Sequence, residues 1–320
     1  MKDKFDRTID YLRISLTDRC NLRCIFCMPD EGVPLLPHEE ILRIEEICAI
    51  VREMALMGLK KVRLTGGEPL LRKGILDLVQ CLRDIPQLEE VTITTNGTML
   101  KDLAEPLKLA GIRRINIGLP SLDPINYKLI TRRGDINKAL EGLQKAMEVG
   151  FHPIKINTVL LKGWNEDPIP FLKLITEFPV EVRFIEYMPL GRLLGKDSFL
   201  SAHEFLEKIS SLTEFKETSS TPGNGPAQKS FQLPNAKGSF SLIAAFSDHF
   251  CPKCNRLRLT SDGEILPCLF SHQGVNLKSA LRPYLDSSAL RLKILEALSL
   301  KPKEKDLSFS TQRFMAQIGG

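Results

Sequence analysis

Strand-like and helix-like patterns of apolar residues alternate along the chain from residue 11 to about residue 210. The pattern predicts strands at 11–17, 61–66, 90–95, 113–119, 154–161 and 180–187, and helices within 39–58, 73–84, 100–110, 135–149 and 168–177. Six β/α units in series predict parallel strands joined by right-handed crossovers. The alternation by itself fits an open sheet as well as a barrel.

The predicted strands carry polar and basic residues on one face and apolar residues on the other. The polar positions are Arg13, Ser15 and Thr17 in the first strand, Lys61, Arg63 and Thr65 in the second, and Lys155 and Asn157 in the fifth. Buried parallel strands normally read as continuous apolar runs, and a filled barrel is lined with branched apolar side chains. We therefore expect an incomplete, open barrel that holds a large polar ligand. An antiparallel sheet with a solvated face is the alternative, which the intervening helices argue against.

The last third of the chain has a different pattern. Residues 216–239 are rich in Ser, Thr, Pro, Gly and Asn and predict an irregular linker. A strand at 240–246, a hairpin turn at 261–263 and helical stretches near 276–283 and 286–298 follow. We therefore expect two domains, a barrel over 1–215 and a second domain over 216–320.

Composition and charge exclude several classes of protein. The 320 residues are 43% hydrophobic and 26% charged, which is typical of a soluble globular protein. No apolar run is long enough to cross a membrane, and residues 1–7 lack the apolar core of a signal peptide, so we expect a cytoplasmic protein. A net charge of +5 is too small to indicate nucleic-acid binding, and it permits an anionic substrate.

The eight cysteines are unevenly distributed. Cys48 and Cys81 stand alone in apolar helical patterns, and we expect both to be core residues, because free Cys packs as a small hydrophobe. The other six form one triplet at 20–27 and another at 251–268. Two such triplets favour two metal centres over a disulfide framework.

The first triplet, Cys20, Cys24 and Cys27, directly follows the first predicted strand. Three thiolates this close can hold three corners of a cubane iron–sulfur cluster and leave the fourth iron open to a small molecule. A zinc site is the alternative, but no second Cys or His pair follows nearby to complete one. With the aromatic Phe26 before the third Cys, the segment resembles the radical S-adenosylmethionine (SAM) signature.

Two loops end predicted strands at what should be the same mouth of the sheet. Residues 65–69 read Thr-Gly-Gly-Glu-Pro, and glycines there allow a ligand to approach the backbone closely. This segment resembles the one that holds the SAM amino group in radical SAM enzymes. Residues 94–97 read Thr-Thr-Asn-Gly and end the third strand, where parallel α/β folds bind ligands.

The second triplet is Cys251, Cys254 and Cys268. It has no fourth cysteine, so His249 or His272 would have to complete a zinc site, and zinc remains an alternative to a second cluster here. Arg256 and Arg258 follow Cys254 and alternate with leucines, which places both on one face of a strand. Paired guanidinium groups suit a phosphate-bearing ligand.

Taken together, residues 9–320 resemble the GTP 3′,8-cyclase (MoaA) family of molybdenum cofactor biosynthesis. The resemblance is carried by residues 12–20, 62–70 and 183–188, by the second Cys triplet with residues 255–259, and by the final Gly319-Gly320. It implies a partial (β/α)6 barrel closed by a C-terminal cluster domain. The implied reaction joins C3′ of GTP to C8 of its guanine and gives 3′,8-cyclo-7,8-dihydro-GTP, the first step of that pathway.

The resemblance also implies the site residues. The first triplet would hold a SAM-cleaving [4Fe–4S] cluster, and the second would hold an auxiliary [4Fe–4S] cluster that contacts guanine. The GTP pocket would be lined by Arg13, Lys61, Arg63, Lys155, Arg256 and Arg258, and SAM would be held by Phe26, Gly67, Thr94, Asn96, Ser121 and Met188. The residues implied in catalysis are Arg13, Arg256, Arg258, Gly319 and Gly320. The two glycines would reach into the site and promote SAM cleavage.

One segment departs from the family pattern. Relatives carry Ser-Leu-Asp where residues 118–120 read Gly-Leu-Pro. Gly118 thus replaces a serine that lies near the SAM carboxylate. Either SAM loses one hydrogen bond, worth about 0.5–1.5 kcal/mol, or the neighbouring Ser121 compensates through an altered loop.

The implied partners are GTP, a cyclic pyranopterin monophosphate synthase as downstream enzyme, an electron donor such as flavodoxin or ferredoxin, and a second copy of the chain in a homodimer. Two other classes stay open. One is a peptide-modifying radical SAM enzyme with an auxiliary cluster, although those usually carry longer Cys-rich C-terminal regions. The other is a non-catalytic iron–sulfur or zinc module, which has no use for polar strand faces.

Overall fold

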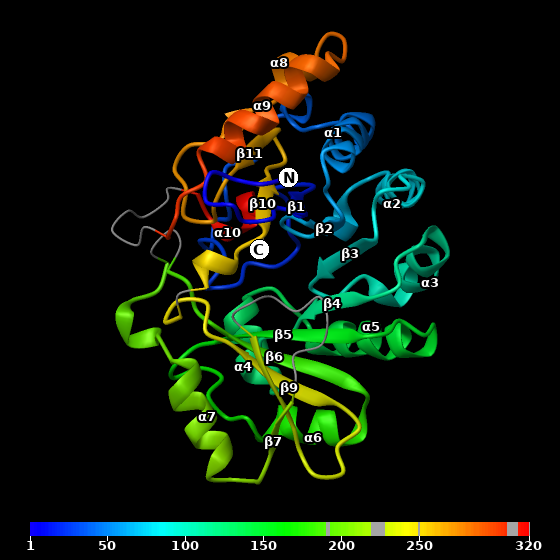
Figure 1. The fold of residues 1–320 in the computed structure, drawn as a ribbon. Coiled ribbons are helices and arrows are strands. Elements are labelled where there is room, and N and C mark those ends of the chain that lie inside the picture. The colour runs from blue at the N-terminus through cyan, green and yellow to red at the C-terminus, as the bar shows by residue number, and fades with distance from the viewer. Residues whose placement is uncertain (190–192, 219–227, 249, 306–312, 320) are drawn as a thin grey trace.

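The computed structural model describes residues 1–189, 193–218, 228–248, 250–305 and 313–319. Parallel strands form a curved, incomplete barrel with helices on its outer face (Figure 1). The strands are β1 (Tyr11–Ser15), β2 (Lys61–Thr65), β3 (Glu90–Thr95), β4 (Ile115–Gly118), β5 (Ile154–Leu160) and β6 (Val180–Glu186). The intervening helices are α1 (Ile44–Leu56), α2 (Ile75–Arg83), α3 (Leu100–Ala110), α4 (Pro124–Thr131), α5 (Ile136–Glu148), α6 (Ile169–Glu177) and α7 (Ala202–Ser210). The incomplete barrel predicted from the polar strand faces is confirmed.

Of the seven helices named above, α4 and α7 were not predicted. The α4 helix begins at Asp123, whose carboxylate accepts the Asn126 N–H (2.7 Å). The α7 helix begins with a capping box, in which Ser201 and Glu204 each accept the other's backbone N–H. A Ser followed three residues later by Glu is a sequence signal for a helix start, so α7 could have been found.

Strands from the last third of the chain extend the barrel sheet at both edges. The β9 strand (Ser239–Ile243) pairs in parallel with β6, and β10 (Arg256–Leu259) pairs in parallel with β1. The outer strands are β8 (Gln228–Gln232) and β7 (Lys216–Thr218) on one side, and β11 (Glu264–Leu266) and β12 (Val275–Asn276) on the other. Residues 216–239 are therefore no irregular linker, since they contain β7 and β8. Their polar composition concealed the edge strands, which the stacked rings of Phe231 and Phe240 anchor.

The main core lies between the strands and the outer helices. Leu12 and Ile14 of β1 are fully buried there, as the strand pattern predicted. Cys48 of α1 and Cys81 of α2 also pack against this core, but they are joined in a disulfide. The expectation of two unpaired core cysteines was wrong, because helix packing brings together two side chains that lie 33 residues apart.

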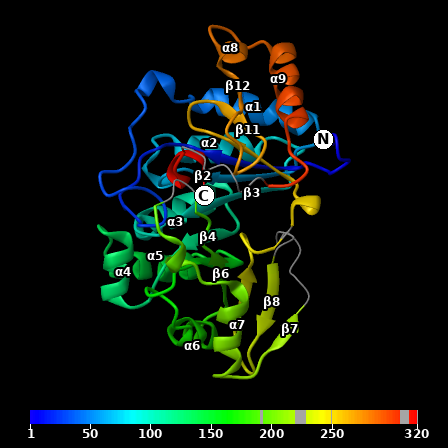
Figure 2. The same ribbon diagram turned by 90° about the vertical axis from the view of Figure 1, so that its left-hand side faces the viewer.

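The remaining helices are α8 (Lys278–Leu281), α9 (Ser287–Ser299) and α10 (Met315–Ile318). Figure 2 shows α8 and α9 beside α1 at one end of the molecule and α10 near the middle of the curved sheet. Short 3-10 turns lie at His38–Glu40, Pro69–Leu71, Lys196–Ser198 and Cys251–Lys253. Helix α10 was not predicted, and it buries Ala316 and Ile318. No helix in the described ranges has the length and apolar character needed to cross a membrane.

Candidate active site

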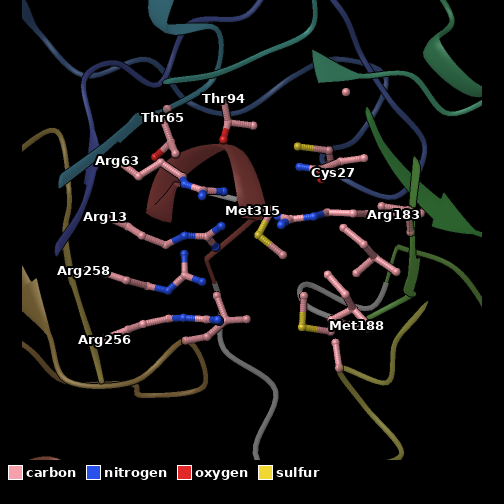
Figure 3. Close-up of a pocket in the computed structure, with 18 of the residues that line it drawn as sticks. Arg13, Cys27, Arg63, Thr65, Thr94, Arg183, Met188, Arg256, Arg258 and Met315 are labelled. Atoms are coloured by element: carbon pink, nitrogen blue, oxygen red, sulfur yellow. The ribbon is translucent and has the colours of Figure 1, made fainter. Parts of the chain in front are cut away.

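Both Cys triplets line a single cavity of about 660 Å³ inside the curved sheet. Guanidinium groups enter it from two sides (Figure 3). Arg13, Arg63, Arg256 and Arg258 form one side, and Arg183 points toward them from the other. The fold thus unites in one site the polar strand faces and the two triplets, which lie at opposite ends of the chain.

The first Cys loop is held against the end of β2 by backbone hydrogen bonds. The Gly67 N–H donates to the Thr17 carbonyl (2.7 Å), and the Glu68 N–H donates to the Arg19 carbonyl (2.8 Å). A Cβ atom on Gly67 would clash with that Arg19 carbonyl, so the close approach requires glycine. The glycine-rich segment therefore positions the Cys loop in addition to facing the cavity.

The three thiols of this loop lie together in a buried environment. Burial raises the pKa of Cys20 to about 11 and that of Cys27 to about 12. It raises the pKa of Cys24 well above its usual range, and the two neighbouring sulfurs add to the effect. None of the three forms a disulfide. Three thiolates can share this space when a cation neutralises them, so the donor set fits an iron–sulfur cluster.

Glu68 ties the end of β2 to the end of β3, and nothing in the sequence pattern assigned it a role. Its carboxylate accepts hydrogen bonds from Thr95 Oγ1 (2.6 Å) and from the N–H groups of Asn96 (2.7 Å) and Leu70 (3.0 Å). Burial raises the pKa of Glu68 to about 7 despite these bonds. Asn96 donates in turn from Nδ2 to Asn21 (2.8 Å) in the Cys loop. This network fixes both strand ends relative to the first triplet.

Most of the residues predicted to bind SAM line the cavity. These are Phe26, Gly67, Thr94, Asn96 and Met188. The Thr94 hydroxyl is buried and has no hydrogen-bond partner among the described residues, so it can serve a ligand.

Ser121 does not belong to this lining. Its hydroxyl accepts the Asp123 N–H (3.0 Å) at the start of α4. Its role toward SAM stays a prediction. Gly118, which replaces the family serine, does line the cavity.

The second triplet also faces the cavity, and none of its thiols is in a disulfide. Burial raises the pKa of Cys268. At Cys254 burial acts in the same direction, but the Lys301 ammonium and nearby donors outweigh it and lower the pKa. The buried Lys301 was missed from the sequence, where it stands in a run of charged residues.

Zinc was the alternative to a cluster at the second triplet. Within the described ranges, no three His, Cys, Asp or Glu side chains converge as ligands of a single metal ion. His272 is exposed to solvent, and His249 lies outside the described residues. The second cluster stays a prediction.

The registers of adjacent strands bring four arginines together. Arg13 of β1 pairs with Arg63 of β2 on one side and with Arg258 of β10 on the other. Arg256 lies two residues before Arg258, on the same face of β10. Burial and the adjacent guanidinium groups lower the pKa of Arg13 well below its usual range, and the same two effects lower that of Arg258 to about 10. This arginine wall (Arg13, Arg63, Arg256 and Arg258) favours a polyanionic ligand such as a triphosphate.

The lysines predicted for the same pocket differ in position. Lys61 lines the cavity, whereas Lys155 is fully buried outside the lining and its Nζ pairs with Glu181 (2.9 Å). Glu181 also accepts a hydrogen bond from Arg183 Nε (2.9 Å), and the Arg183 side chain extends into the cavity (Figure 3). The GTP-binding role of Lys155 stays a prediction, and Arg183 joins the candidates.

The segment before the final glycine lies inside the site. Met315 lines the cavity, and Ala316 donates a backbone hydrogen bond to Cys27. Gly319 has a left-handed φ of +74°, and a Cβ atom there would clash with Thr65 Oγ1. Gly320 lies outside the described residues.

Comparison with known proteins first defines the class. Residues 14–175 match the Radical SAM superfamily model, and the chain therefore belongs to this superfamily of SAM-dependent iron–sulfur enzymes. Residues 180–307 match the model described as Molybdenum Cofactor Synthesis C. The crystal structure of Streptococcus suis SuiB shares the fold, with a TM-score of 0.62 at 17% identity over 93% of this chain and 68% of that one.

Full-length relatives then define the particular family. The chain is 47% identical to the GTP 3′,8-cyclase of Petrotoga mobilis and 44% identical to that of Pelotomaculum thermopropionicum. Each alignment covers 100% of both chains. The chain belongs to the GTP 3′,8-cyclase family.

Proposed function

We propose that this enzyme converts GTP into 3′,8-cyclo-7,8-dihydroguanosine 5′-triphosphate, the first step of molybdenum cofactor biosynthesis. One observation carries the proposal. Both Cys triplets line the same cavity as the arginine wall, whose residues lie on the adjacent strands β2, β1 and β10. A triphosphate needs dense positive charge, and the radical chemistry of the superfamily needs a cluster beside its substrate.

Cys20, Cys24 and Cys27 would hold the [4Fe–4S] cluster of the superfamily, and the Gly67 segment would bind SAM beside it. When bound, SAM and this cluster supply the radical that removes hydrogen from the substrate. The Thr94 hydroxyl and the Asn96 amide, which both line the cavity, would orient the bound nucleotides.

Cys251, Cys254 and Cys268 would hold a second [4Fe–4S] cluster that binds the guanine. Arg256 and Arg258 lie within this triplet, just after Cys254, so the base and the phosphates would lie close to the same strand. The arginine wall would hold the triphosphate and so place the ribose between the two triplets. Holding both reactants in one enclosed cavity limits water and aligns C3′ with C8 of the same nucleotide.

The proposal extends to partners. A flavodoxin or ferredoxin would deliver electrons, a cyclic pyranopterin monophosphate synthase would take the product, and the enzyme would act as a homodimer. A cytoplasmic location would keep the six cluster thiols reduced.

Anaerobic reconstitution followed by incubation with GTP, SAM and dithionite tests the proposal. We expect about eight irons per chain, and the cyclic dihydro-GTP as product. Replacement of the second triplet by Ala should halve the iron and leave SAM cleavage measurable. SAM cleavage without any product from GTP would favour a different radical SAM enzyme, such as a peptide modifier. Stoichiometric zinc with about four irons would overturn the second cluster.

A further inference from the structure

Lys301 is a buried cation beside the second Cys triplet. Its side chain follows α9, and the residue is only 2% exposed. Its Nζ donates to the carbonyls of Arg256 (2.7 Å) and Pro267 (2.8 Å) and to Cys254 Sγ (3.6 Å). No carboxylate of the described residues lies within ion-pair distance of this ammonium. A buried ammonium with neutral acceptors alone is costly, so it calls for a negative charge nearby.

The three acceptors of Lys301 belong to the two segments that carry cysteines. Arg256 lies two residues after Cys254, and Pro267 immediately precedes Cys268. One ammonium therefore joins the loop before β10 to the loop after β11. These segments are also joined by the antiparallel pairing of β10 with β11, and the lysine adds a second link beyond the paired residues, beside the two sulfurs.

The segment that follows Lys301 contacts the third cysteine. The Lys305 N–H donates to Cys251 Sγ (3.3 Å). Arg7 donates from Nη1 to the carbonyls of Cys251 (2.9 Å) and Lys303 (3.1 Å), and from Nη2 to that of Pro302 (2.7 Å). Residues 301–305 are thus fastened to the second triplet from both sides, and Lys301 is held at a fixed position.

The hydrogen-bond donors at Cys20 of the first triplet are of a different kind. Cys20 Sγ accepts hydrogen bonds from the Leu22 N–H (3.4 Å) and the Asn96 Nδ2 (3.9 Å), both of which are neutral donors. A cationic donor at a cluster sulfur stabilises the more negative, reduced cluster, and hydrogen bonds and net charge are known determinants of cluster potential. The two centres of this enzyme are therefore built to differ.

We propose that Lys301 is a positioning residue of the second centre, which holds the Cys254 and Cys268 segments together and raises the reduction potential of the cluster bound there. The inference rests on the second cluster of the proposed function. It assigns to a residue outside both Cys motifs the task of keeping the second cluster easier to reduce than the first.

The test uses the full-length, anaerobically reconstituted enzyme and three variants. Lys301→Met removes both the charge and the donors, Lys301→Gln keeps a donor without the charge, and Lys303→Met is a matched control with the same loss of charge at an exposed position. Iron per chain, thermal unfolding and an EPR-monitored redox titration of each cluster are measured.

We expect Lys301→Gln to keep its iron and to shift the potential of the second cluster to more negative values, while the first cluster and Lys303→Met are unchanged. Lys301→Met should shift it further or lose half of the iron with little change in the unfolding midpoint. Full iron with an unshifted potential in both Lys301 variants would overturn the inference. So would global unfolding of both, because Lys301 would then serve the fold. If the unsubstituted enzyme binds only one cluster, the proposed function fails before any variant is compared.

Discussion

Arg258 of β10 donates a hydrogen bond from Nη1 to the backbone carbonyl of Ile318 in α10 (3.3 Å). The same nitrogen contacts the carbonyl of Gly319. One residue of the arginine wall is therefore occupied by the final segment of the described chain, while Ala316 of that segment contacts Cys27. The short α10 helix thus connects the triphosphate side of the cavity to the first Cys triplet.

Gly319→Ala tests this connection. The added Cβ would clash with Thr65 Oγ1, which is held by its hydrogen bond to the Ile14 carbonyl (2.9 Å), and φ is +74°. We expect product formation to fall about tenfold or more, equivalent to at least ~1.4 kcal/mol in the barrier. The iron content should not change. Gly163→Ala is the matched control, because its φ of +79° causes similar backbone strain and nothing lies within 4 Å. Equal activity of the two variants would show that the Gly319 contact is unimportant.

Arg256→Ala should weaken GTP binding. Loss of one charged donor from the arginine wall is expected to cost about 1.5–3 kcal/mol, or roughly 10- to 150-fold in Kd. Equilibrium binding under anaerobic conditions measures this loss of affinity. The affinity for GMP should fall less than the affinity for GTP, because GMP has fewer phosphates. Arg83→Ala removes the same charge from an exposed position on α2 and should leave Kd unchanged. A similar loss of GTP affinity in both variants would show that the effect comes from the net charge of the protein and not from the position of Arg256.

Tyr11 predicts a pH dependence of GTP binding. Burial raises the pKa of Tyr11, but the guanidinium groups of Arg63, Arg13 and Arg256 outweigh burial and lower it to about 8. Below pH 8 the phenol is neutral and the arginine wall keeps its full charge. Above pH 8 the phenolate forms and cancels part of that charge, so GTP binding should weaken by an amount on the order of 1 kcal/mol.

Tyr11→Phe separates this effect from the titration of GTP itself. The variant should bind GTP equally well at pH 7 and lose less affinity than the unsubstituted enzyme between pH 7 and pH 9. Parallel affinity curves for the two proteins would assign the whole pH dependence to the nucleotide and exclude Tyr11.

Arg7→Met should destabilise the fold and the second centre together. Arg7 and Asp3 form an ion pair whose side chains are only 7% and 0% exposed, and breaking a buried pair costs about 3–5 kcal/mol. Urea unfolding measures the loss, and iron should be lost from the second centre first because Arg7 anchors Cys251. Lys2→Met breaks the exposed pair with Asp6 and should cost less than about 1 kcal/mol. Unfolding midpoints that coincide for the two variants would contradict the anchoring role.

Local regularities in the chain were enough to predict the incomplete barrel and the basic residues of β1, β2 and β10 that line its cavity. The alternation in 11–15 placed Leu12 and Ile14 in the core and Arg13 on the inner face, because side chains of a strand alternate whatever the strand pairs with. The Cys20–Cys27 motif likewise lies within eight residues and needs no distant partner to be recognised. Edge strands β7 and β8 escaped notice because short, polar strands carry little of this signal.

Only the tertiary structure decided which distant residues meet. The pairing of Arg13 with Arg258, the ammonium of Lys301 beside Cys254, and the contact of Arg7 with Cys251 each join segments far apart in the chain. The tertiary structure also places the Lys155 ammonium against Glu181 and outside the cavity lining, although the position of Lys155 in its strand resembles that of Arg13. Strand and helix periodicity is a property of neighbouring residues, whereas these contacts depend on sheet order and helix packing, which no local pattern of side chains encodes.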